Sequence, residues 1–481
     1  MLLFIDGKHV PARDGATFAS RSPVTGEVLA DVADASPADG LLAVAAAGRA
    51  FAEWSRVSFA ERRAVLLRAA DLLEADFPRT RDSLALEVGA VRGWAEMNTA
   101  EAAATLREAA GLASSPLGSV LPSADPSGAN LSLRTAAGVV LAIVPWNAPV
   151  VLAARSVAIA LALGNTVILR PSEQAPHAAG HLLADVLTRA GAPAGVVNVV
   201  TCSPSRSKEL VASLVAEPAV RRVVFIGSTP VGRSIASVAG NALTPAVLEL
   251  GGKNPTLVLS DADLDTAADH VAFAAFANSG QVCMSTDRVL VAAPVFAELC
   301  ERVAARAAAL SIGDPRLDTT AVGPLITDAA AARFTSLVAD SVSRGARVLT
   351  GGSADGRYAT PTVLTDVSAE SQLYSTESFA PLITLQPFAD EPAMIAAAND
   401  TPYGLIASVL SSDASHAWHL ARSLRCGAVH VNGPSVGDEP HVPFGGLAAS
   451  GSGRLGGVES VLTFTEQRTF YLHGTEVLPN P

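Results

Sequence analysis

From Val139 onward, short runs of β-branched residues alternate with segments whose composition suits helices. The first four runs span residues 139–144, 166–169, 196–200 and 222–226. Strands that alternate with helices in this way pair in parallel, and helices cover both faces of the sheet. A second set of runs follows Gly252, at residues 256–259, 289–291 and 382–386. The chain is therefore predicted to have an α/β fold built from two such units.

The segments that flank these units have other patterns. Residues 41–74 and 84–113 place apolar side chains three and four positions apart, which predicts helices. Residues 116–130, rich in Gly, Pro and Ser, separate these helices from the first unit. Near the end, residues 427–432 predict a strand, and the alternation over residues 460–472 predicts an edge strand that pairs with another subunit.

Length and composition exclude several classes of protein. A chain of 481 residues exceeds what one hydrophobic core usually supports, so two or three domains are expected. The net charge of −12 argues against partners made of nucleic acid and against anionic membranes. No apolar stretch is long enough to span a bilayer, and the first residues lack the basic leader of a signal peptide. Four scattered cysteines form no disulfide framework, which favours the reducing cytoplasm.

Three short motifs carry side chains that suit catalysis. A lone cysteine, Cys283, follows Gly-Gln-Val and supplies a nucleophile. Upstream, Glu249 opens the sequence Glu-Leu-Gly-Gly-Lys and supplies a carboxylate base. The segment Val-Pro-Trp-Asn-Ala-Pro places the side-chain amide of Asn147 where it can hold a developing oxyanion. Nucleophile, base and oxyanion donor together favour covalent catalysis.

Each of these residues also has a simpler interpretation. Cys283 alone would be a small buried hydrophobic side chain. Glu249 alone would form a salt bridge with Lys253 at the end of a strand, and Asn147 alone would cap a helix that follows Pro145.

Residues 222–232 predict a strand, a tight turn and the start of a helix. Ser228 or Thr229 can cap that helix and Pro230 suits its first turn. Free backbone N–H groups at such a helix start bind phosphate. The spacing from Gly227 to Gly232 departs from Gly-x-Gly-x-x-Gly, so an ordinary helix start explains this segment equally well.

Taken together, the three motifs and the Phe-x-Gly-Ser turn closely resemble the aldehyde dehydrogenase superfamily, and the resemblance covers most of the chain. It implies a Rossmann-like cofactor domain, an α/β catalytic domain and a small β element for oligomerisation, with catalysis in the cleft between the domains. It also implies that Cys283 attacks an aldehyde, that Asn147 and the Cys283 backbone N–H stabilise the oxyanion, and that Glu249 activates water. This base favours hydrolysis over transfer of the acyl group to CoA, and no metal is expected.

The resemblance divides the chain into six parts. They are the first part of the cofactor-binding domain (1–117), the first part of the oligomerisation strands (118–137), the Rossmann-like core (138–250), the catalytic domain (251–424), a return to the cofactor domain with a substrate loop (425–457) and an oligomerisation tail (458–481).

The resemblance also implies an NAD(P) site. Glu173 is expected to bind the ribose hydroxyls and to favour NAD, whereas Arg170, where relatives have lysine, can accommodate the extra phosphate of NADP. Ala380 stands where relatives have glycine in Phe-Gly-Pro. The cofactor-binding residues implied by the resemblance are Val144, Pro145, Trp146, Arg170, Ser172, Glu173, Gly227, Ser228, Gly232, Leu250, Glu377 and Phe379.

The segment 429–446 is most similar to the members of the superfamily that act on salicylaldehyde, benzaldehyde and vanillin. Arg155 follows Asn147 by about two helical turns, so it lies on the same face and can point into the substrate channel. A surface arginine in a salt bridge is the alternative for Arg155, and plain core packing is the alternative for Trp94. The expected substrate residues are Trp94, Met97, Arg155, Val282 and Met284.

The leading hypothesis is thus an NAD-dependent oxidation of small aromatic aldehydes by a homodimer or homotetramer, with NADP possible. One rival is the same chemistry on an aliphatic or semialdehyde substrate, because Arg155 can also hold a carboxylate. A rival of another class is a non-catalytic NAD-binding structural protein, and a third is ester or thioester hydrolysis without hydride transfer.

Overall fold

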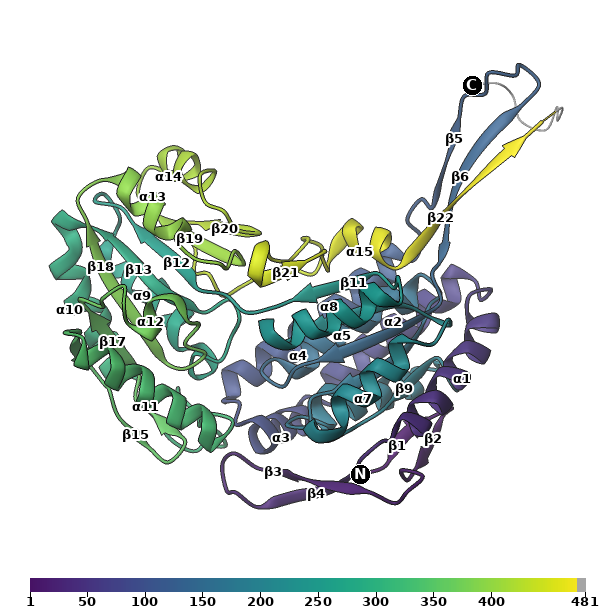
Figure 1. Ribbon diagram of the computed structural model, residues 1–481, viewed down its shortest axis with the longest axis horizontal. Helices are drawn as coiled ribbons and strands as arrows, with labels where there is room; N and C mark the ends of the chain where they lie inside the picture. Colours follow the sequence, from purple (N-terminus) through teal and green to yellow (C-terminus); the bar gives the residue numbers. More distant parts are fainter. Residues whose placement is uncertain (474–481) are drawn as a thin grey trace.

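The computed structural model describes residues 1–473, and two large sheets dominate them (Figure 1). The first sheet has eight strands in the order β2-β1-β9-β8-β7-β10-β11-β21, and the five strands from β9 to β11 are parallel. In that order the strands are Lys8–Val10, Leu3–Ile5, Val197–Val199, Thr166–Pro171, Val139–Val144, Val220–Ile226, Ala246–Glu249 and Gly451–Ser452.

Both faces of the first sheet are covered, because its central strand β7 is apolar at every position. In β7, Val140, Ala142 and Val144 belong to one cluster, with helices α2 (Phe59–Ala75), α4 (Arg92–Leu112), α5 (Pro149–Ala162) and α6 (Leu182–Arg189). The alternate residues Val139, Leu141 and Ile143 belong to another cluster, with helices α1 (Pro37–Trp54), α7 (Pro204–Val215) and α8 (Thr229–Asn241). Successive side chains of a strand point to opposite faces, which explains the continuous apolar run.

The second sheet has seven strands in the order β14-β17-β18-β13-β12-β19-β20, all parallel except β14. In that order they are Arg347–Thr350, Thr362–Thr365, Leu382–Phe388, Thr286–Ala292, Asn254–Val258, Ile406–Leu410 and Ala428–Val431. Helices α9 (Leu264–Phe276) and α10 (Phe296–Ala308) cover one face, and α11 (Asp328–Ser343), α13 (Glu391–Asn399) and α14 (Ala414–Ala421) cover the other. The two α/β units predicted from the sequence are therefore confirmed.

A third sheet forms an arm that projects from the body (Figure 1). It consists of β5 (Gly118–Leu121), β6 (Ala129–Ala136) and β22 (Thr465–Leu472), with β6 in the middle. Two small hairpins complete the strands: β3 (Thr17–Arg21) with β4 (Val28–Ala33), and β15 (Ala354–Asp355) with β16 (Tyr358–Ala359). The remaining helices are α3 (Phe77–Val88), α12 (Gln372–Ser375), α15 (Gly457–Thr463) and the short turns His177–His181, Ala277–Gly280, Ala293–Val295 and Ala448–Ser450.

The N-terminal helices are shorter than predicted. The segment 41–74 is interrupted between α1 and α2, because Ser58 and Glu61 form a capping box that starts a new helix. The segment 84–113 is interrupted at Gly89, whose left-handed backbone (φ 70°) ends α3. Polar capping residues and one glycine thus break an apolar pattern that continues across the interruptions.

The C-terminal part differs in two respects. Residues 460–463 are helical, in α15, and the strand starts only at Thr465. This strand, β22, pairs with β6 of the same chain along its whole length. Its other edge has no partner among the described residues, and the expected pairing with another subunit stays a prediction. Strand β20 pairs with β19 in the second sheet, although the sequence division placed residues 425–457 in the return to the cofactor domain. Residues 474–481 of the expected tail lie outside the described residues.

Among residues 1–473, no helix combines the length and the hydropathy that a membrane span requires.

Candidate active site

The loop that carries Cys283 has a fixed backbone. Gly280 has a left-handed conformation (φ 69°), and a Cβ there would lie 2.2 Å from the carbonyl oxygen of Ala380. Only glycine satisfies both conditions. On the other side, the Asn254 side-chain amide donates to the carbonyl oxygen of Cys283 at 2.7 Å. The position of Cys283 is thus determined by contacts with the second sheet and with the segment that contains Ala380.

Asn147 lies next to this loop and is buried. Its side-chain Nδ2 donates to the carbonyl oxygen of Gln281 at 3.0 Å. Its own carbonyl oxygen accepts from Trp94 Nε1 at 2.8 Å and from Asn278 Nδ2 at 3.0 Å. The N-cap of α5 is Ala148, so the interpretation of Asn147 as a helix cap is wrong.

Glu249 is the last residue of β11 and is almost completely buried. Neither carboxylate oxygen has a hydrogen-bond partner among the described residues. Burial raises the pKa of the Glu249 carboxyl well above its ordinary value, and the charges of Arg454 and Arg155 oppose this rise without cancelling it. Lys253 forms an ion pair with Asp287 at 3.1 Å and not with Glu249, so the salt-bridge interpretation is wrong.

The environment of the Cys283 thiol is apolar and negatively charged. Burial raises its pKa to about 12, and the nearby carboxyls of Glu377 and Glu249 act in the same direction. The protein alone therefore keeps this sulfur as a neutral thiol. A positive charge close to the sulfur would favour the thiolate.

Three cavities meet around these residues. A large cavity of about 610 Å³ lies at the carboxyl ends of β7, β8 and β10, and eight of the residues expected to bind a cofactor line it: Val144, Pro145, Trp146, Arg170, Ser172, Glu173, Gly227 and Ser228. A central cavity of about 510 Å³ continues from it and is lined by Asn147, Glu249, Leu250, Cys283, Glu377 and Phe379. An inner pocket of about 90 Å³ lies beyond and contains all five expected substrate residues, Trp94, Met97, Arg155, Val282 and Met284.

Cys283 and Asn147 line both the central cavity and the inner pocket. They lie at the junction of two cavities, and the residues of these cavities were expected from the sequence to bind different ligands, the cofactor and the aldehyde. Gly232 lines none of the three cavities. A Cβ at this position would lie 2.5 Å from a methyl group of Leu250. Its role is to let α8 pack closely against that side chain.

The large cavity presents groups that suit a dinucleotide. Ser228 is the N-cap of α8, Pro230 lies in the first turn, and the Ser228 side chain makes no capping bond. Thr229 instead donates its hydroxyl to the carbonyl oxygen of Ala449 at 2.9 Å. The first N–H groups of α8 thus lack a side-chain cap beside the large cavity, as an anion site at a helix start requires. Ser228 occupies the N-cap position predicted from the sequence, but neither Ser228 nor Thr229 makes a side-chain capping bond.

Arg170 is oriented by two neighbours at the edge of this cavity. Its Nε donates to the sulfur of Cys202 at 3.3 Å, and a terminal nitrogen lies 3.6 Å from the carboxylate of Glu173. Its positive charge is therefore opposed by a carboxylate that lines the same cavity.

The segment around Phe379 closes the central cavity from the second unit. The Gly252 N–H donates to the Glu377 carboxylate at 3.0 Å, and burial raises the pKa of that carboxyl to about 7. The rings of Phe379 and Trp146 meet edge to face at 5.8 Å. Ala380 is buried in an apolar cluster, and the close backbone approach falls at Gly280. Alanine is accommodated there for this reason.

Arg155 is buried in α5 and pairs with Asp438, so the interpretation as a surface arginine is wrong. Its guanidinium also lies 5.7 Å from the centre of the Phe444 ring. Trp94 combines both interpretations, because it packs in the core and lines the inner pocket.

Two acidic residues of the inner pocket, Glu101 and Asp438, were not identified as functional from the sequence. Glu101 lies four residues after Met97 and seven after Trp94, which places all three on one face of α4. That spacing was the signal that would have identified Glu101.

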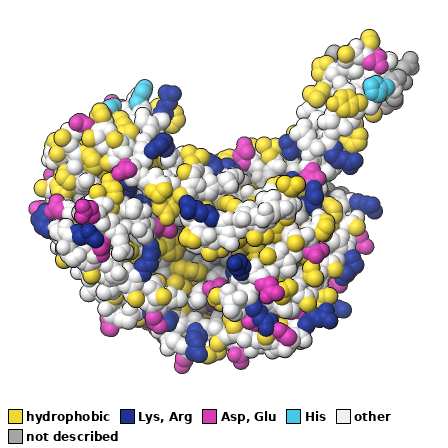
Figure 2. All heavy atoms as spheres, viewed as in Figure 1, with side chains coloured by type: hydrophobic (Ala, Val, Ile, Leu, Met, Phe, Trp, Pro, Cys, Tyr) yellow, Lys and Arg dark blue, Asp and Glu magenta, His cyan; other side chains and the backbone are white. Residues whose placement is uncertain are grey.

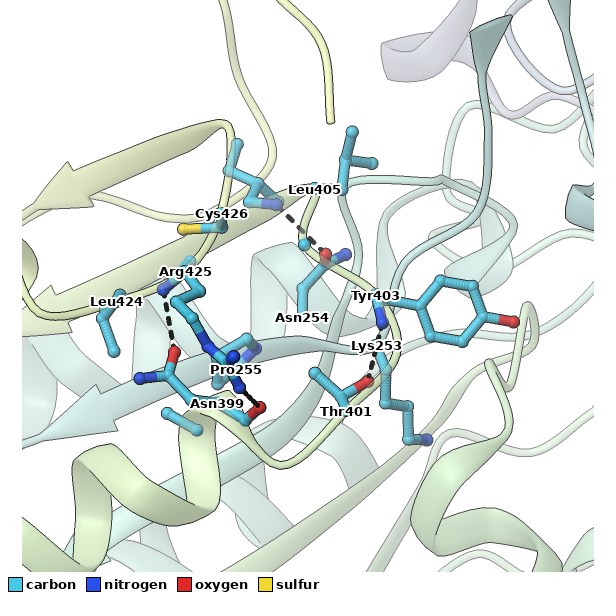
Figure 3. A pocket seen from close by; sticks show the side chains of 14 residues that line it. Lys253, Asn254, Pro255, Asn399, Thr401, Tyr403, Leu405, Leu424, Arg425 and Cys426 are labelled. Carbon is cyan, nitrogen blue, oxygen red and sulfur yellow. Dashed lines mark hydrogen bonds between the residues drawn. The ribbon is translucent and has the colours of Figure 1, made fainter. Parts of the chain in front are cut away.

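A further small cavity lies behind the site, between residues 253–255 and 398–426 (Figure 3). Its lining is held by hydrogen bonds from the backbone of Arg425 to Asn399 and of Tyr403 to Thr401. Its volume of about 10 Å³ holds no more than one water molecule. The chemistry therefore belongs to the three connected cavities.

Comparison with known proteins agrees with this geometry. Residues 9–470 match the model of the aldehyde dehydrogenase family. A vanillin dehydrogenase of Pseudomonas fluorescens is 44% identical over 466 residues, which are 97% of this chain and 96% of the relative. A benzaldehyde dehydrogenase [NAD(+)] of Pseudomonas putida is 40% identical over 447 residues, 93% of this chain and 91% of the relative. The crystal structure of a salicylaldehyde dehydrogenase from Pseudomonas putida G7, complexed with salicylaldehyde, is similar with a TM-score of 0.96 and 37% identity, over 98% of this chain and 97% of that one.

Proposed function

This chain belongs to the aldehyde dehydrogenase family, and from that premise we propose that it oxidises aromatic aldehydes to carboxylic acids with NAD. The observation that carries the proposal is the position of Cys283 and Asn147, which line both the central cavity and the inner pocket. An aldehyde in the inner pocket and a hydride acceptor in the central cavity would meet at this sulfur.

Cys283 is the proposed nucleophile. Its thiol first loses its proton to water. The sulfur then bonds to the aldehyde carbon, the carbonyl π bond breaks, and the carbonyl oxygen becomes an oxyanion. A side-chain amide has two N–H bonds, and Asn147 uses one of them to bind the Gln281 carbonyl. The other N–H remains for the oxyanion, together with the backbone N–H of Cys283. Such a donor typically lowers the barrier by ~3 kcal/mol.

The residues of the large and central cavities suit NAD. When bound, NAD supplies a positive charge near the thiol and accepts the hydride that leaves the former aldehyde carbon. The first turn of α8 would hold the pyrophosphate, and Glu173 and Glu377 would accept hydrogen bonds from the two riboses. Loss of hydride leaves a thioester on Cys283.

Glu249 is the proposed base for the second half of the reaction. Its carboxylate takes a proton from water, and the hydroxide attacks the thioester, which releases the acid and restores Cys283. A carboxylate whose pKa is raised by burial is a stronger base than an exposed one, which suits this step. Hydrolysis without CoA is therefore the expected outcome.

The inner pocket supports an aromatic substrate. Trp94 and Phe444 supply flat apolar surfaces, and Met97, Val282 and Met284 supply further apolar contacts. The vanillin and benzaldehyde dehydrogenases that resemble this chain have aromatic substrates by name, and the similar crystal structure holds salicylaldehyde.

We also propose that the chain forms homodimers or homotetramers through its arm. The arm exposes apolar side chains, Val120, Leu121, Leu133, Phe470 and Tyr471, and Figure 2 shows hydrophobic surface on it. Both outer strands of this sheet, β5 and β22, have an edge without a partner in residues 1–473.

The four cysteines are free and scattered, which supports the cytoplasm as the location.

The substrate proposal is tested by the rate of NADH formation with benzaldehyde, vanillin, salicylaldehyde, hexanal and succinic semialdehyde. We expect the three ring aldehydes to give the highest kcat/KM, because they fill a pocket with aromatic walls. Cys283→Ala should abolish the reaction, and Asn147→Ala should lower kcat by about 100- to 1000-fold. Turnover confined to hexanal and succinic semialdehyde would keep the mechanism and refute the aromatic substrate.

The role of Glu249 is tested by the pH dependence of kcat. A base must lose its proton to act, and burial raises this carboxyl's pKa above 4.5. Activity should therefore fall as the pH drops through a value well above 4.5. Glu249→Gln should still form one NADH per active site in a rapid burst and then hydrolyse the thioester slowly. Glu53→Gln, an exposed control, should behave like the unaltered chain. A steady rate without a burst in Glu249→Gln would contradict this role.

Cofactor preference is tested with Glu173→Gln. The carboxylate repels the phosphate of NADP and opposes the charge of Arg170 at 3.6 Å. Its neutralisation should shift the ratio of kcat/KM for NADP over NAD by about tenfold towards NADP, which corresponds to ~1.4 kcal/mol in the difference between the two activation free energies. Arg170→Ala in the same background should reverse the gain. An unchanged ratio of kcat/KM would show that Glu173 does not discriminate between NAD and NADP.

The arm is tested by light scattering coupled to size-exclusion chromatography. Tyr471→Glu places a charge on an apolar side chain of the arm that is 68% exposed, so it should reduce the molar mass towards that of one chain. Leu243→Glu is the matched control, because Leu243 is 89% exposed and lies in the loop after α8, outside the three strands of the arm. Equal masses for both variants would exclude this surface of the arm as the interface.

A further inference from the structure

The turn that precedes Cys283 has an unusual backbone. Asn278, Ser279 and Gly280 all adopt the left-handed conformation, with φ of 48°, 58° and 69°. Glycine adopts this conformation without strain, whereas a residue with a Cβ does not. Asn278 and Ser279 are both buried. Strained residues of this kind persist only where surrounding contacts hold them, and they are concentrated at functional sites.

Two hydrogen bonds join this turn to its own unit. The hydroxyl of Ser279 donates to the carbonyl oxygen of Gly323 at 2.9 Å. The side-chain oxygen of Gln281, the residue after the turn, accepts from the N–H of Ile326 at 2.9 Å. Residues 323–326 precede α11, which covers the second sheet. These bonds hold the turn, but they do not relate it to the first unit.

Asn278 and Asn147 make that connection, because each binds a backbone carbonyl of the other's segment. Nδ2 of Asn278 donates to the carbonyl oxygen of Asn147, and Nδ2 of Asn147 donates to the carbonyl oxygen of Gln281, both at 3.0 Å. Asn147 follows β7 of the first sheet, whereas Asn278 and Gln281 follow α9 of the second unit. Two hydrogen bonds in opposite directions fix both the distance and the relative orientation of the two segments, which one bond alone would not do.

The carbonyl oxygen of Asn147 is held from both units. Trp94 Nε1 donates to it at 2.8 Å from α4, which packs on the first sheet, and a carbonyl oxygen can accept this bond together with that from Asn278. Asparagine is also the residue with a Cβ that tolerates a left-handed backbone well. That tolerance alone explains an asparagine in the turn, but it does not explain a side-chain amide bound to the backbone of the oxyanion donor.

We propose that Asn278 is a positioning residue, which holds the side-chain amide of Asn147 and the backbone N–H of Cys283 at the spacing that the oxyanion requires. Asn278 lines neither the central cavity nor the inner pocket, so it acts through Asn147. The inference rests on the proposed role of Asn147 as an oxyanion donor. Such donors lower a barrier only when they already lie where the charge develops, so a small displacement of the amide is costly in rate.

The test is a double-mutant cycle on a single turnover, with the enzyme in excess over benzaldehyde and NAD saturating. Asn278→Gly keeps the left-handed backbone and removes the amide, so it should lower the rate of NADH formation by about tenfold. In the Asn147→Ala background the same change should lower the rate by less than about twofold, because the amide that Asn278 positions is gone. Calorimetry should show the same Kd for NAD with and without Asn278→Gly.

Ser279→Gly is the matched control. Ser279 lies in the same turn with the same backbone conformation, and the change removes a buried hydrogen bond whose acceptor is Gly323 and not Asn147. Its effect on the rate, whatever its size, should be equal in the unaltered and Asn147→Ala backgrounds. Equal effects of Asn278→Gly in the two backgrounds would overturn the proposal and leave Asn278 with a role in the fold of the turn alone.

A second variant covers the case in which Asn278→Gly does not fold. Asn278→Asp keeps the size of the side chain and its tolerance of the left-handed backbone, and it places a carboxylate oxygen where the donor was. It should slow the single turnover by about tenfold or more, again only when Asn147 is present. The Tm of each variant shows whether it is folded.

The same cycle separates this inference from the proposed function. If Asn147→Ala leaves the single-turnover rate unchanged, the proposed oxyanion donor is wrong, and the role of Asn278 fails with it. If Asn147→Ala slows the reaction and neither folded Asn278 variant does, the proposed mechanism stands and the positioning role is overturned.

Discussion

The contact between Gly280 and the carbonyl of Ala380 is the constraint on which the rest of the site depends. Because no Cβ fits there, the loop that carries the nucleophile lies directly against the segment that carries Glu377 and Phe379. These two residues reach the central cavity from the second unit, while Asn147 and Glu249 reach it from the first. One backbone contact therefore sets the distance between the sulfur and the wall on which a nicotinamide would rest.

Burial determines how each ionisable group around this contact behaves. Lys253 pairs with Asp287, which opposes the lowering of its pKa by burial, and Arg155 pairs with Asp438, which raises its pKa. Glu249 has no such partner, and its pKa rises. The protein thus neutralises its cations in pairs and leaves a carboxyl unpaired at the position where a base is needed. The energetic cost of that unpaired group is characteristic of sites built for function and not for stability.

The sequence predicted those parts of the fold that local pattern controls. The apolar run at 139–144 became β7 with the predicted bounds, because a strand buried on both faces must be apolar at every position. The breaks at Ser58 and Gly89 were missed, since a helix pattern persists across them and only capping geometry reveals the interruption. The catalytic candidates were predicted through motifs, and the structure brings all three to one cavity. The pairing of Arg155 with Asp438 joins residues far apart in the chain, and periodicity carries no information on such contacts.

The pairing of strand β21 determines when the active site is completed during synthesis of the chain. Its two residues, Gly451 and Ser452, pair with Glu249 and Leu248 at the edge of the first sheet. The edge of the strand that carries the proposed base is therefore completed by a segment that lies far downstream of it in the chain. During synthesis, the nucleophile and the oxyanion donor leave the ribosome long before that segment does. A nascent chain that has already folded the strands up to β20 still has an open edge at β11, and its reactive centre stays unfinished until residues 451–452 have been synthesised.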